Sequence, residues 1–276
     1  MTPTRQPAPV PSLRRAGLAA LLAALLLPCL GPASARASEW FPLEPGRRWA
    51  YRTHRDVSLA PAGRSLERRL QHGRSERKIV PEPGAAGSVA LEERRVERAA
   101  EGGGPREREL VETRRAVYRE TDEGVLLLSE ETRGDGGSES RDLVTHTPPV
   151  RWLPRELAPG ARWSLGRVQQ DGLVLELQAQ VSGPEDVRSD AGPHPGSLAV
   201  RYQGTVTGRA RMGAEALEVK EGRYRRTLWL ARGTGVVLDE SDTDLRLLDA
   251  GGNEIRWSQT LRETLQPASA PAGAVR

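Results

Sequence analysis

The chain has 276 residues, of which 28% are charged, 37% are hydrophobic and only 4% are aromatic, and it holds a single cysteine. One cysteine excludes an internal disulfide and a zinc site built on several cysteines. Four of the 41 basic residues and none of the 37 acidic residues lie in residues 1–37, so the rest of the chain is balanced at 37 of each. This balance gives no reason to expect a nucleic-acid partner.

Residues 1–37 are typical of a secretory signal peptide. Three arginines precede an apolar run over residues 18–30, and Ala35-Arg36-Ala37 offers a small-x-small cleavage site. The apolar run is shorter than the ~20 residues that span a bilayer, and no second long run follows. We therefore expect an exported protein, periplasmic or extracellular, without a transmembrane span.

The lone cysteine lies inside this leader. Cys29 follows Pro28, and a proline fits poorly at a lipoprotein processing site. Removal of Cys29 with the leader is favoured over lipid anchoring, which stays open as the lesser alternative.

A phrase of tryptophan, proline and glycine occurs twice. It runs from Trp40 to Trp49 and again from Trp152 to Trp163, and both copies have the pattern Trp-apolar-Pro, a spacer, then Pro-Gly-x-Arg-Trp. Proline fixes φ before a turn and glycine supplies a positive φ within it. Each copy therefore predicts a turn that leads into a strand.

A second phrase is also repeated. Tyr118 stands six residues before Gly124, and Trp229 stands six residues before Gly235. Two phrases in the same order at nearly the same spacing indicate a tandem duplication. The predicted division is a signal peptide over 1–37, a first β repeat over 38–150, a second over 151–265 and a disordered tail over 266–276.

In the first repeat, residues 49–53 alternate as a half-buried strand should. The polar stretch over residues 66–80 is expected to fold back on itself at His72-Gly73, and residues 81–87 form a turn. The charged strands of this half are expected to form the solvent-exposed face of the sheet.

Residues 88–100 have helix-forming side chains, but the strand-like run over 110–118 and the intervening Gly102-Gly103-Gly104 favour a hairpin. Glutamates and arginines would then face each other across the two strands.

The second repeat has clearer strand patterns. Asp171-Gly172 between alternating apolar runs predicts one hairpin, and Gly251-Gly252 predicts another. Residues 183–196 hold three prolines and predict a long loop. Each half should be a meander of five or six strands. We predict an all-β protein of two tandem antiparallel meander repeats, packed as a sandwich or as one curled, partly open barrel-like sheet.

The segments Phe41–Tyr51, Leu153–Trp163 and Trp229–Val237 resemble a family of exported bacterial proteins that repeat an FPL-x-x-G-x-x-W-x-Y phrase, some of them labelled TapB-like. The resemblance covers most of residues 39–265. It departs at Ala231-Arg232-Gly233, where the family has Ala-Pro-Gly. The resemblance implies an exported all-β protein of unknown function, and it supplies no catalytic residues.

Residues that could carry chemistry show no known arrangement. The chain has no Gly-x-Ser-x-Gly elbow or phosphate-binding glycine loop. Glu130-Glu131 and the acidic stretch 239–244 could serve glycoside hydrolysis, or in the second case calcium, but are interpreted as solvated strand edges. The histidines form no His-x-x-x-His or Glu-x-x-His pair and are interpreted as surface residues. They are His54, His72, His146 and His194.

The repeated aromatic and glycine residues are expected to be structural anchors rather than a sugar-binding platform. No catalytic, cofactor-binding or metal-binding residue is assigned, and no cofactor is expected. The anchors are Trp40, Trp49, Tyr118, Gly124, Trp152, Trp163, Trp229 and Gly235.

Three functions remain open. The favoured one is a non-catalytic envelope scaffold or interaction module whose partner would be another envelope protein. The second is a carrier that encloses an apolar or lipid ligand. The third is a hydrolase whose acids meet between the two halves. The carrier would need a cavity lined by residues such as Leu175, Leu177, Val200 and Tyr202.

Overall fold

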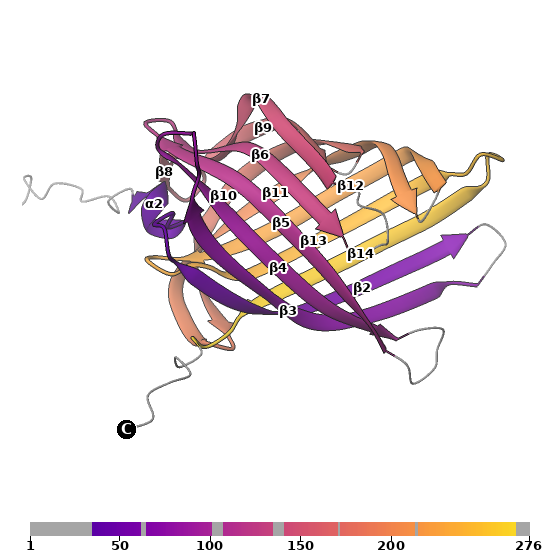
Figure 1. The fold of residues 1–276 in the computed structure, drawn as a ribbon, viewed down its shortest axis with the longest axis horizontal. Helices are drawn as coiled ribbons and strands as arrows, with labels where there is room; N and C mark the ends of the chain where they lie inside the picture. The colour runs from indigo at the N-terminus through magenta and orange to yellow at the C-terminus, as the bar shows by residue number, and fades with distance from the viewer. Residues whose placement is uncertain are drawn as a thin grey trace, which may run out of the picture. The chain divides into compact units, whose positions relative to one another are not determined.

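The computed structural model consists almost entirely of β-strands (Figure 1). It describes residues 35–61, 65–100, 107–134, 141–170, 172–212 and 215–268. Twelve strands form one antiparallel sheet in the order β7-β6-β5-β4-β3-β2-β14-β13-β12-β11-β10-β9. They are β2 (Arg48–Pro61), β3 (Glu67–Pro81), β4 (Ser88–Ala100), β5 (Glu107–Thr121), β6 (Gly124–Gly134), β7 (Arg141–Pro154), β9 (Arg162–Gln170), β10 (Leu173–Ser189), β11 (Gly192–Met212), β12 (Glu215–Ala231), β13 (Gly235–Leu248) and β14 (Glu254–Leu265).

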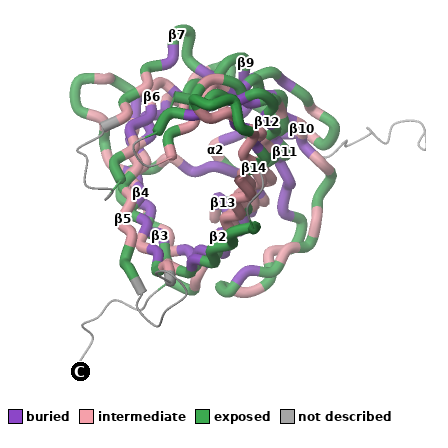
Figure 2. Tube along the Cα trace, turned by 90° about the vertical axis from the view of Figure 1, so that its right-hand side faces the viewer, coloured by how far each residue is buried: buried purple, intermediate pink, exposed green. Residues whose placement is uncertain are grey.

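The sheet curls until it is nearly a closed barrel. The last strand, β14, pairs with the first, β2, from Leu265↔Tyr51 to Ile255↔Pro61. Strands β7 and β9 contact each other but share no ladder, which leaves one unsealed seam. Figure 2 shows the strands encircling a common axis. The predicted all-β fold of two meanders in one curled, partly open sheet is confirmed.

Both copies of the Pro-Gly phrase form the same turn. Gly46 and Gly160 have φ of 93° and 84°, values that only glycine adopts without strain. The Gly46 N–H donates to the Ile79 carbonyl at 2.8 Å, and the Gly160 N–H donates to the Val181 carbonyl at 2.9 Å. Each turn is therefore attached in the same way to the second strand after it, β3 in the first copy and β10 in the second.

The other repeated residues also occupy corresponding positions. Trp49 is the second residue of β2, and Trp163 is the second residue of β9. Gly124 and Gly235 begin β6 and β13 with φ of 127° and 96°. A Cβ at Gly124 would lie 2.1 Å from the Leu153 carbonyl oxygen, so this close approach requires glycine. The predicted boundary between repeats, at residues 150 and 151, falls within β7.

The polar stretch over residues 66–80 does not fold back at His72-Gly73. It is the continuous strand β3, which pairs with β2 on one side and β4 on the other. Gly73 lies in this ladder, where a Cβ would lie 2.0 Å from the Val96 carbonyl oxygen. The glycine permits close packing of two strands instead of a turn.

The predicted hairpin of β4 and β5 is confirmed, and its glutamates and arginines do face each other. Glu93 is opposite Arg114, and Arg95 is opposite Glu112. The Gly102-Gly103-Gly104 run lies outside the described residues. The charged strands do present a solvent-exposed outer face, with Glu76 and Arg94 exposed, but they also bury charges on their inner face, where Glu93 and Arg95 lie.

Residues 183–196 are not a loop. Strand β10 continues to Ser189, and β11 begins at Gly192 after a two-residue turn. Register shifts between Val181 and Pro184, and again before Val187, accommodate the extra residues as bulges. This hairpin tip folds onto the outer face of the sheet, where the Trp229 Nε1–H donates to Glu185 Oε2 at 2.8 Å.

The N-terminal described residues close one end of the barrel. Strand β1 (Ala35–Arg36) pairs with β8 (Glu156–Leu157), and the single helical turn α2 (Ala37–Trp40) follows it. Ala37 and Trp40 are buried, and Phe41 packs edge-on against Tyr118 at 5.5 Å between ring centroids. Cleavage after Ala37 would remove the β1–β8 ladder.

Several predictions fall on parts of the chain outside the described residues. These parts hold residues 1–34 of the predicted leader with Cys29, residue 171 of the Asp171-Gly172 hairpin, and residues 269–276 of the tail. Within the described part, β9 and β10 pair as the hairpin requires, and the hairpin of β13 and β14 is confirmed. None of the described helices has the length and apolar character needed to cross a membrane.

Candidate functional site

The inner face of the barrel, its lumen, has two walls of different chemistry. One, the charged wall, comes from β2 to β6 with β13 and β14, and β12 adds Arg226 to it. The other, the apolar wall, comes from β10 to β12. The charged wall consists of Arg55, Arg77, Glu93, Arg95, Glu97, Glu112, Arg114, Glu130, Arg226, Asp239 and Glu263, and the apolar wall of Leu175, Leu177, Val200, Tyr202, Val206 and Leu228.

Glu263 is the centre of the charged wall. Its side chain is 1% exposed, and its two carboxylate oxygens accept from two arginines. Arg77 Nη2 donates to Oε2, and Arg95 Nη2 donates to Oε1 at 3.2 Å. Arg95 also donates to Glu93 at 2.9 Å, and Ser75 donates to the same Glu93 oxygen at 2.8 Å. A buried carboxylate needs such donors, because its desolvation is costly.

A second pair joins β5 to β6. Arg114 Nη2 donates to Glu130 Oε1, and His146 Nε2 lies 3.8 Å from Glu130 Oε2. Burial raises the pKa of Glu130, but the charge and hydrogen bond of Arg114 together with those of His146 outweigh burial and lower the pKa to about 2. Glu130 and Glu131 are therefore not a solvated edge, since both are buried. His146 is not a surface residue either, since it is buried beside Glu130.

A third pair lies on β12 and β13. Arg226 donates to both oxygens of Asp239, at 2.9 and 2.7 Å. Burial raises the pKa of Asp239, but the charge and hydrogen bonds of Arg226 together with the Arg77 charge more than offset burial, so the net shift is downward. The acidic stretch 239–244 is thus divided by the strand's alternation. Asp239 is buried, whereas Asp242 and Asp244 pair outside with Arg225.

Glu97 differs from the other acids of the charged wall. Its side chain is 4% exposed, and its Oε2 lies 3.2 Å from Arg55 Nε. Its Oε1 has no hydrogen-bond donor among the described residues. Burial therefore dominates and raises the pKa of Glu97.

Aromatic rings fill the lumen beside α2. Trp152 stacks on Tyr202 at 5.0 Å between centroids, and Trp163 meets Tyr202 edge-on at 6.3 Å. The Arg226 guanidinium lies over the Trp152 ring at 5.5 Å. Tyr118 completes this cluster at 6.4 Å from Trp152. This end of the lumen is a packed core.

A cavity of about 280 Å³ lies between the two walls. Arg55, Arg95 and Thr132 line its polar side, and Leu175 and Trp257 line its apolar side. Of the four residues that the carrier hypothesis named, only Leu175 lines the cavity. Leu177, Val200 and Tyr202 are buried in the core.

Three arginines at the cavity have unused donors. The Nε–H groups of Arg55, Arg77 and Arg95 are buried and have no hydrogen-bond acceptor among the described residues. Carboxylate oxygens lie 3.2, 3.5 and 4.0 Å from these nitrogens, close enough for an ion pair but without hydrogen-bond geometry. An unpaired buried N–H costs about 1–3 kcal/mol, so an added acceptor would be stabilising.

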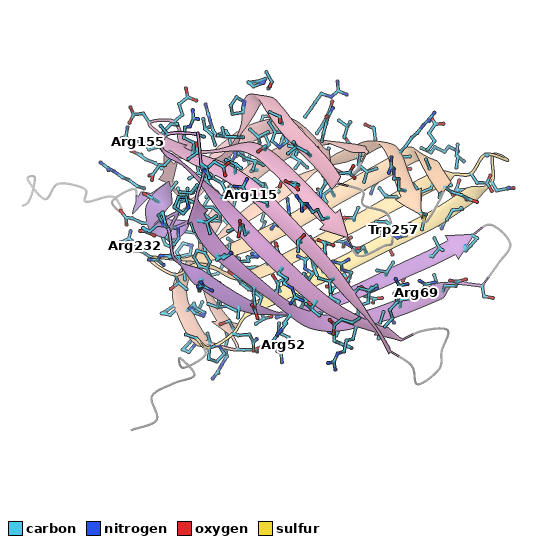
Figure 3. All side chains as sticks on the ribbon, in the orientation of Figure 1. Arg52, Arg69, Arg115, Arg155, Arg232 and Trp257 are labelled. Carbon is cyan, nitrogen blue, oxygen red and sulfur yellow. The ribbon has the colours of Figure 1, made fainter. Side chains whose placement is uncertain are left out.

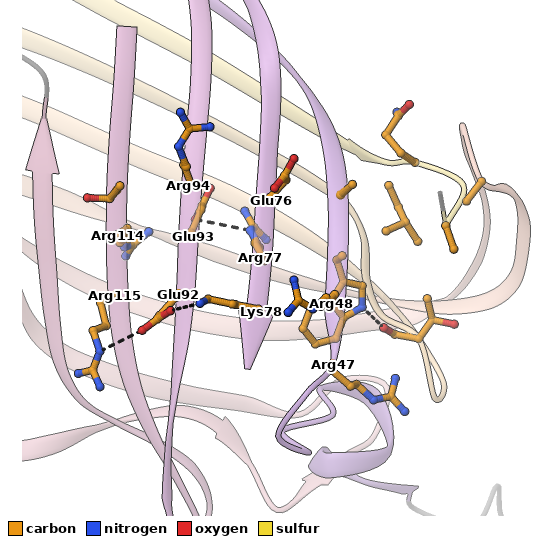
Figure 4. A pocket seen from close by; sticks show the side chains of 18 of the residues that line it. Arg47, Arg48, Glu76, Arg77, Lys78, Glu92, Glu93, Arg94, Arg114 and Arg115 are labelled. Carbon is orange, nitrogen blue, oxygen red and sulfur yellow. Dashed lines mark hydrogen bonds and ion pairs between the residues drawn. The ribbon is translucent and has the colours of Figure 1, made fainter. Parts of the chain in front are cut away.

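The outer face of β2 to β6 has a larger hollow of about 1120 Å³ (Figure 4). Its floor carries charges that pair between neighbouring strands. Lys78 lies 2.7 Å from Glu92, and Arg115 lies 3.8 Å from the same residue. Because these charges pair with each other, the hollow is a weaker candidate for a ligand than the lumen.

The predicted anchors lie mostly near the ends of strands, and Trp40 lies in α2. Trp40 and Trp163 are buried, and the half-buried Trp49 donates through Nε1 to the Thr234 carbonyl at 2.7 Å. None of the eight anchor residues lines the lumen cavity, whereas Trp49 lines the outer hollow. In the described part of the chain, no three His, Cys, Asp or Glu side chains converge as a metal site.

Sequence reasoning missed the charged wall. Glu93, Arg95 and Glu97 share one face of β4, but Glu92 and Arg94 on the other face are equally polar. The alternation therefore gave no signal for which face is buried.

Comparison with known proteins gives little further information. No family model and no curated protein matches the chain. DynF, from the dynemicin biosynthesis pathway of Micromonospora chersina, is similar with a TM-score of 0.31 and 12% identity over 88% of both chains. A protein with a YmcC-like fold from Bacteroides fragilis, proposed to be exported, has a TM-score of 0.29 and 12% identity over 83% of this chain and 97% of its own. Similarities this weak carry no argument about function.

Proposed function

We propose that this protein is a non-catalytic binding protein whose lumen holds a small amphipathic molecule with a hydrogen-bond acceptor at one end. The observation that carries the proposal is the cavity between the two walls. Unused arginine N–H donors lie on one side of it, and leucine and tryptophan side chains lie on the other. The expected export rests on residues 1–37 and is part of the same proposal.

The cavity's size and lining indicate the ligand class. About 280 Å³ is near the lower end of the roughly 300–1,000 Å³ typical of ligand pockets, so the molecule is small. Its hydrocarbon part would contact Leu173, Leu175 and Trp257, and its acceptor would take N–H groups from Arg55 and Arg95. A carboxylate is the acceptor that arginine binds most strongly, so a fatty acid is the first ligand to test.

The acids at the cavity support a role in binding rather than catalysis. Both oxygens of Glu263 accept from arginines, and both oxygens of Asp239 accept from Arg226. A general acid or base must be able to exchange a proton with its substrate. Carboxylates held in this way are poorly placed to do so, which argues against the hydrolase hypothesis.

Isothermal titration calorimetry with octanoate tests the proposal. We expect saturable binding of octanoate and much weaker binding of octan-1-ol, which has the same chain length but no charge. Leu175→Trp should fill the apolar side and weaken octanoate binding at least ~10-fold, the equivalent of about 1.4 kcal/mol. Val174→Trp is the matched control, since Val174 lies on the outer face of the same strand.

Two results would overturn the proposal. One is the absence of saturable octanoate binding to the unmodified protein. The other is equal weakening by Leu175→Trp and Val174→Trp, which would place the bound molecule outside the lumen. Circular dichroism of both variants would show that they keep the strand content of the parent.

A further inference from the structure

A pocket of about 620 Å³ lies on the outer face, beside the tip of the β10–β11 hairpin. The sheet contributes the outward-facing residues of three adjacent strands, and the hairpin contributes the end of β10. Its lining consists of Arg52, His54, His72, Arg188, Ser189, Asp190, Arg262 and Thr264.

The strand register brings these side chains together. Arg262 on β14 is opposite His54 on β2, and His54 is opposite His72 on β3. The two imidazole rings lie 4.4 Å apart between centroids. Arg52, labelled in Figure 3, lies two residues before His54 on the same face of β2. The side chains from the sheet therefore form a continuous basic floor.

The hairpin tip adds Asp190, the single acid among the described lining residues, and a further arginine, Arg188. Asp190 Oδ1 accepts from Arg52 Nη2 at 2.8 Å, and Asp190 Oδ2 accepts from Gln266 Nε2. Asp190 is therefore already engaged through both oxygens. Arg188 has no ion-pair partner among the described residues, and Arg262 pairs at 3.3 Å with the half-exposed Glu240, which does not line the pocket.

Positive charge is in surplus at this pocket. Among the described residues, three arginines line it against the single carboxylate of Asp190, and only one of the three, Arg262, pairs with an acid outside the pocket. Like charges held close together repel one another, and a bound anion would relieve that repulsion. The lumen differs, because nearly every arginine there has a buried carboxylate partner.

We infer that this pocket binds the phosphate group of a larger molecule. Arginine forks bind phosphate through paired N–H donors. Arg188, which has no ion-pair partner among the described residues, together with the remaining donors of Arg52 and Arg262, suits the three oxygens of a phosphate better than a single carboxylate. A volume of about 620 Å³ leaves room for the organic part of a phosphate ester. The site is separate from the lumen and does not depend on what the lumen binds.

Proton NMR of the histidine rings tests the inference at low salt and pH 7. The chain has four histidines, and single His→Gln variants assign their signals. Titration with glycerol 3-phosphate, and with inorganic phosphate, should shift the His54 and His72 ring signals saturably. The signal of His146, which is buried in the lumen, should not move.

Arginine variants show whether the shift reports this pocket. Arg188→Ala and Arg262→Ala should each weaken glycerol 3-phosphate binding about 10-fold or more. Arg225→Ala is the matched control, because Arg225 is also an exposed outer-face arginine, 3.1 Å from Asp242 on the neighbouring strand. Non-saturable shifts, or equal effects of all three variants, would overturn the inference.

A vesicle-binding experiment distinguishes a soluble phosphate ester from a lipid headgroup as the ligand. The protein is sedimented with phosphatidylglycerol vesicles and, as a control, with phosphatidylcholine vesicles. Co-sedimentation with phosphatidylglycerol that is lost in Arg188→Ala would identify a lipid headgroup as the ligand. Binding of glycerol 3-phosphate alone would identify a soluble ester. Binding to neither would overturn the inference, whatever the outcome of the octanoate titration.

Discussion

The inner faces of the two repeats differ far more than their turns do. Arg77 on β3 and Glu93 on β4 face the lumen in the first half, whereas Leu177 on β10 and Val200 on β11 face it in the second. Both halves nevertheless form six-stranded meanders with the same Pro-Gly turns. The comparison teaches that turns and register specify this fold, while the lumen's chemistry can vary as long as buried charges find partners.

The two walls should respond differently to mutation. Apolar burial is non-directional and contributes roughly 25 cal/mol per Å². A buried ion pair gains little net free energy but costs about 3–5 kcal/mol when one partner is removed. Removing one partner of a well-paired buried ion pair should therefore destabilise the protein more than truncating an apolar side chain, and the predictions below test this difference.

The largest effect is expected at Arg77. Arg77→Met would leave Glu263 and Glu93 short of a buried cation, so the free energy of unfolding should fall by about 3–5 kcal/mol. Arg74→Met, on the outer face of the same strand, removes only an exposed pair with Glu76 at 3.7 Å and should cost less than about 1 kcal/mol. Urea unfolding measures both. Similar losses in the two variants would contradict the inward assignment of Arg77.

The apolar wall should lose somewhat less on truncation. Leu228 is 1% exposed, and Leu228→Ala should lower the free energy of unfolding by about 2–5 kcal/mol through lost burial and a new cavity. Thr227→Ala, one residue away on the outer face, should change it by about 0.5 kcal/mol or less. A loss of stability in Thr227→Ala as large as that in Leu228→Ala would contradict the assignment of Leu228 to the inner face of β12 and of Thr227 to its outer face.

Alkaline titration tests the burial of the tyrosines on both walls without mutation. The chain's four tyrosines are Tyr51, Tyr118, Tyr202 and Tyr224, and burial raises the pKa of each, that of Tyr118 to about 12. A raised pKa stabilises the folded state below the unfolded value near 10, and this stabilisation is lost as pH rises through the folded value. Absorbance at 295 nm should show that tyrosinate forms at a higher pH in the folded protein than in the same protein unfolded in urea. Tyrosinate that forms near pH 10 in the folded protein would contradict the burial.

The smallest effect is expected at Glu97. Because burial raises its pKa, the folded state favours the protonated form, and the associated stability is lost as pH rises through the folded pKa. Glu97→Gln should therefore leave stability at pH 7 unchanged or raise it by up to about 1 kcal/mol. Glu93→Gln should lower it, because the pKa of Glu93 is shifted downward by Arg77 and Arg95. Urea unfolding at pH 5 and pH 7 separates the two, and equal losses would refute the distinction.

Predictions from the sequence succeeded where the signal was local. The apolar alternation of β10 and the glycines of the β13–β14 hairpin indicated strand and turn correctly, because each depends on neighbouring residues. The long polar strand β3 was divided wrongly at Gly73, since a glycine that permits close packing resembles one that permits a turn. Arg77 and Glu263 could not be paired from the sequence, because 186 residues separate them.

The sequence by itself determined that this protein is built of β-strands joined by Pro-Gly turns, because proline, glycine and apolar alternation act on the local backbone. Only the tertiary structure decided which face of each charged strand is buried and which arginine meets which carboxylate. The physical reason is that a charge can be buried only beside its partner. In this barrel, the curling of the sheet and the pairing of β14 with β2 bring together partners from distant parts of the chain.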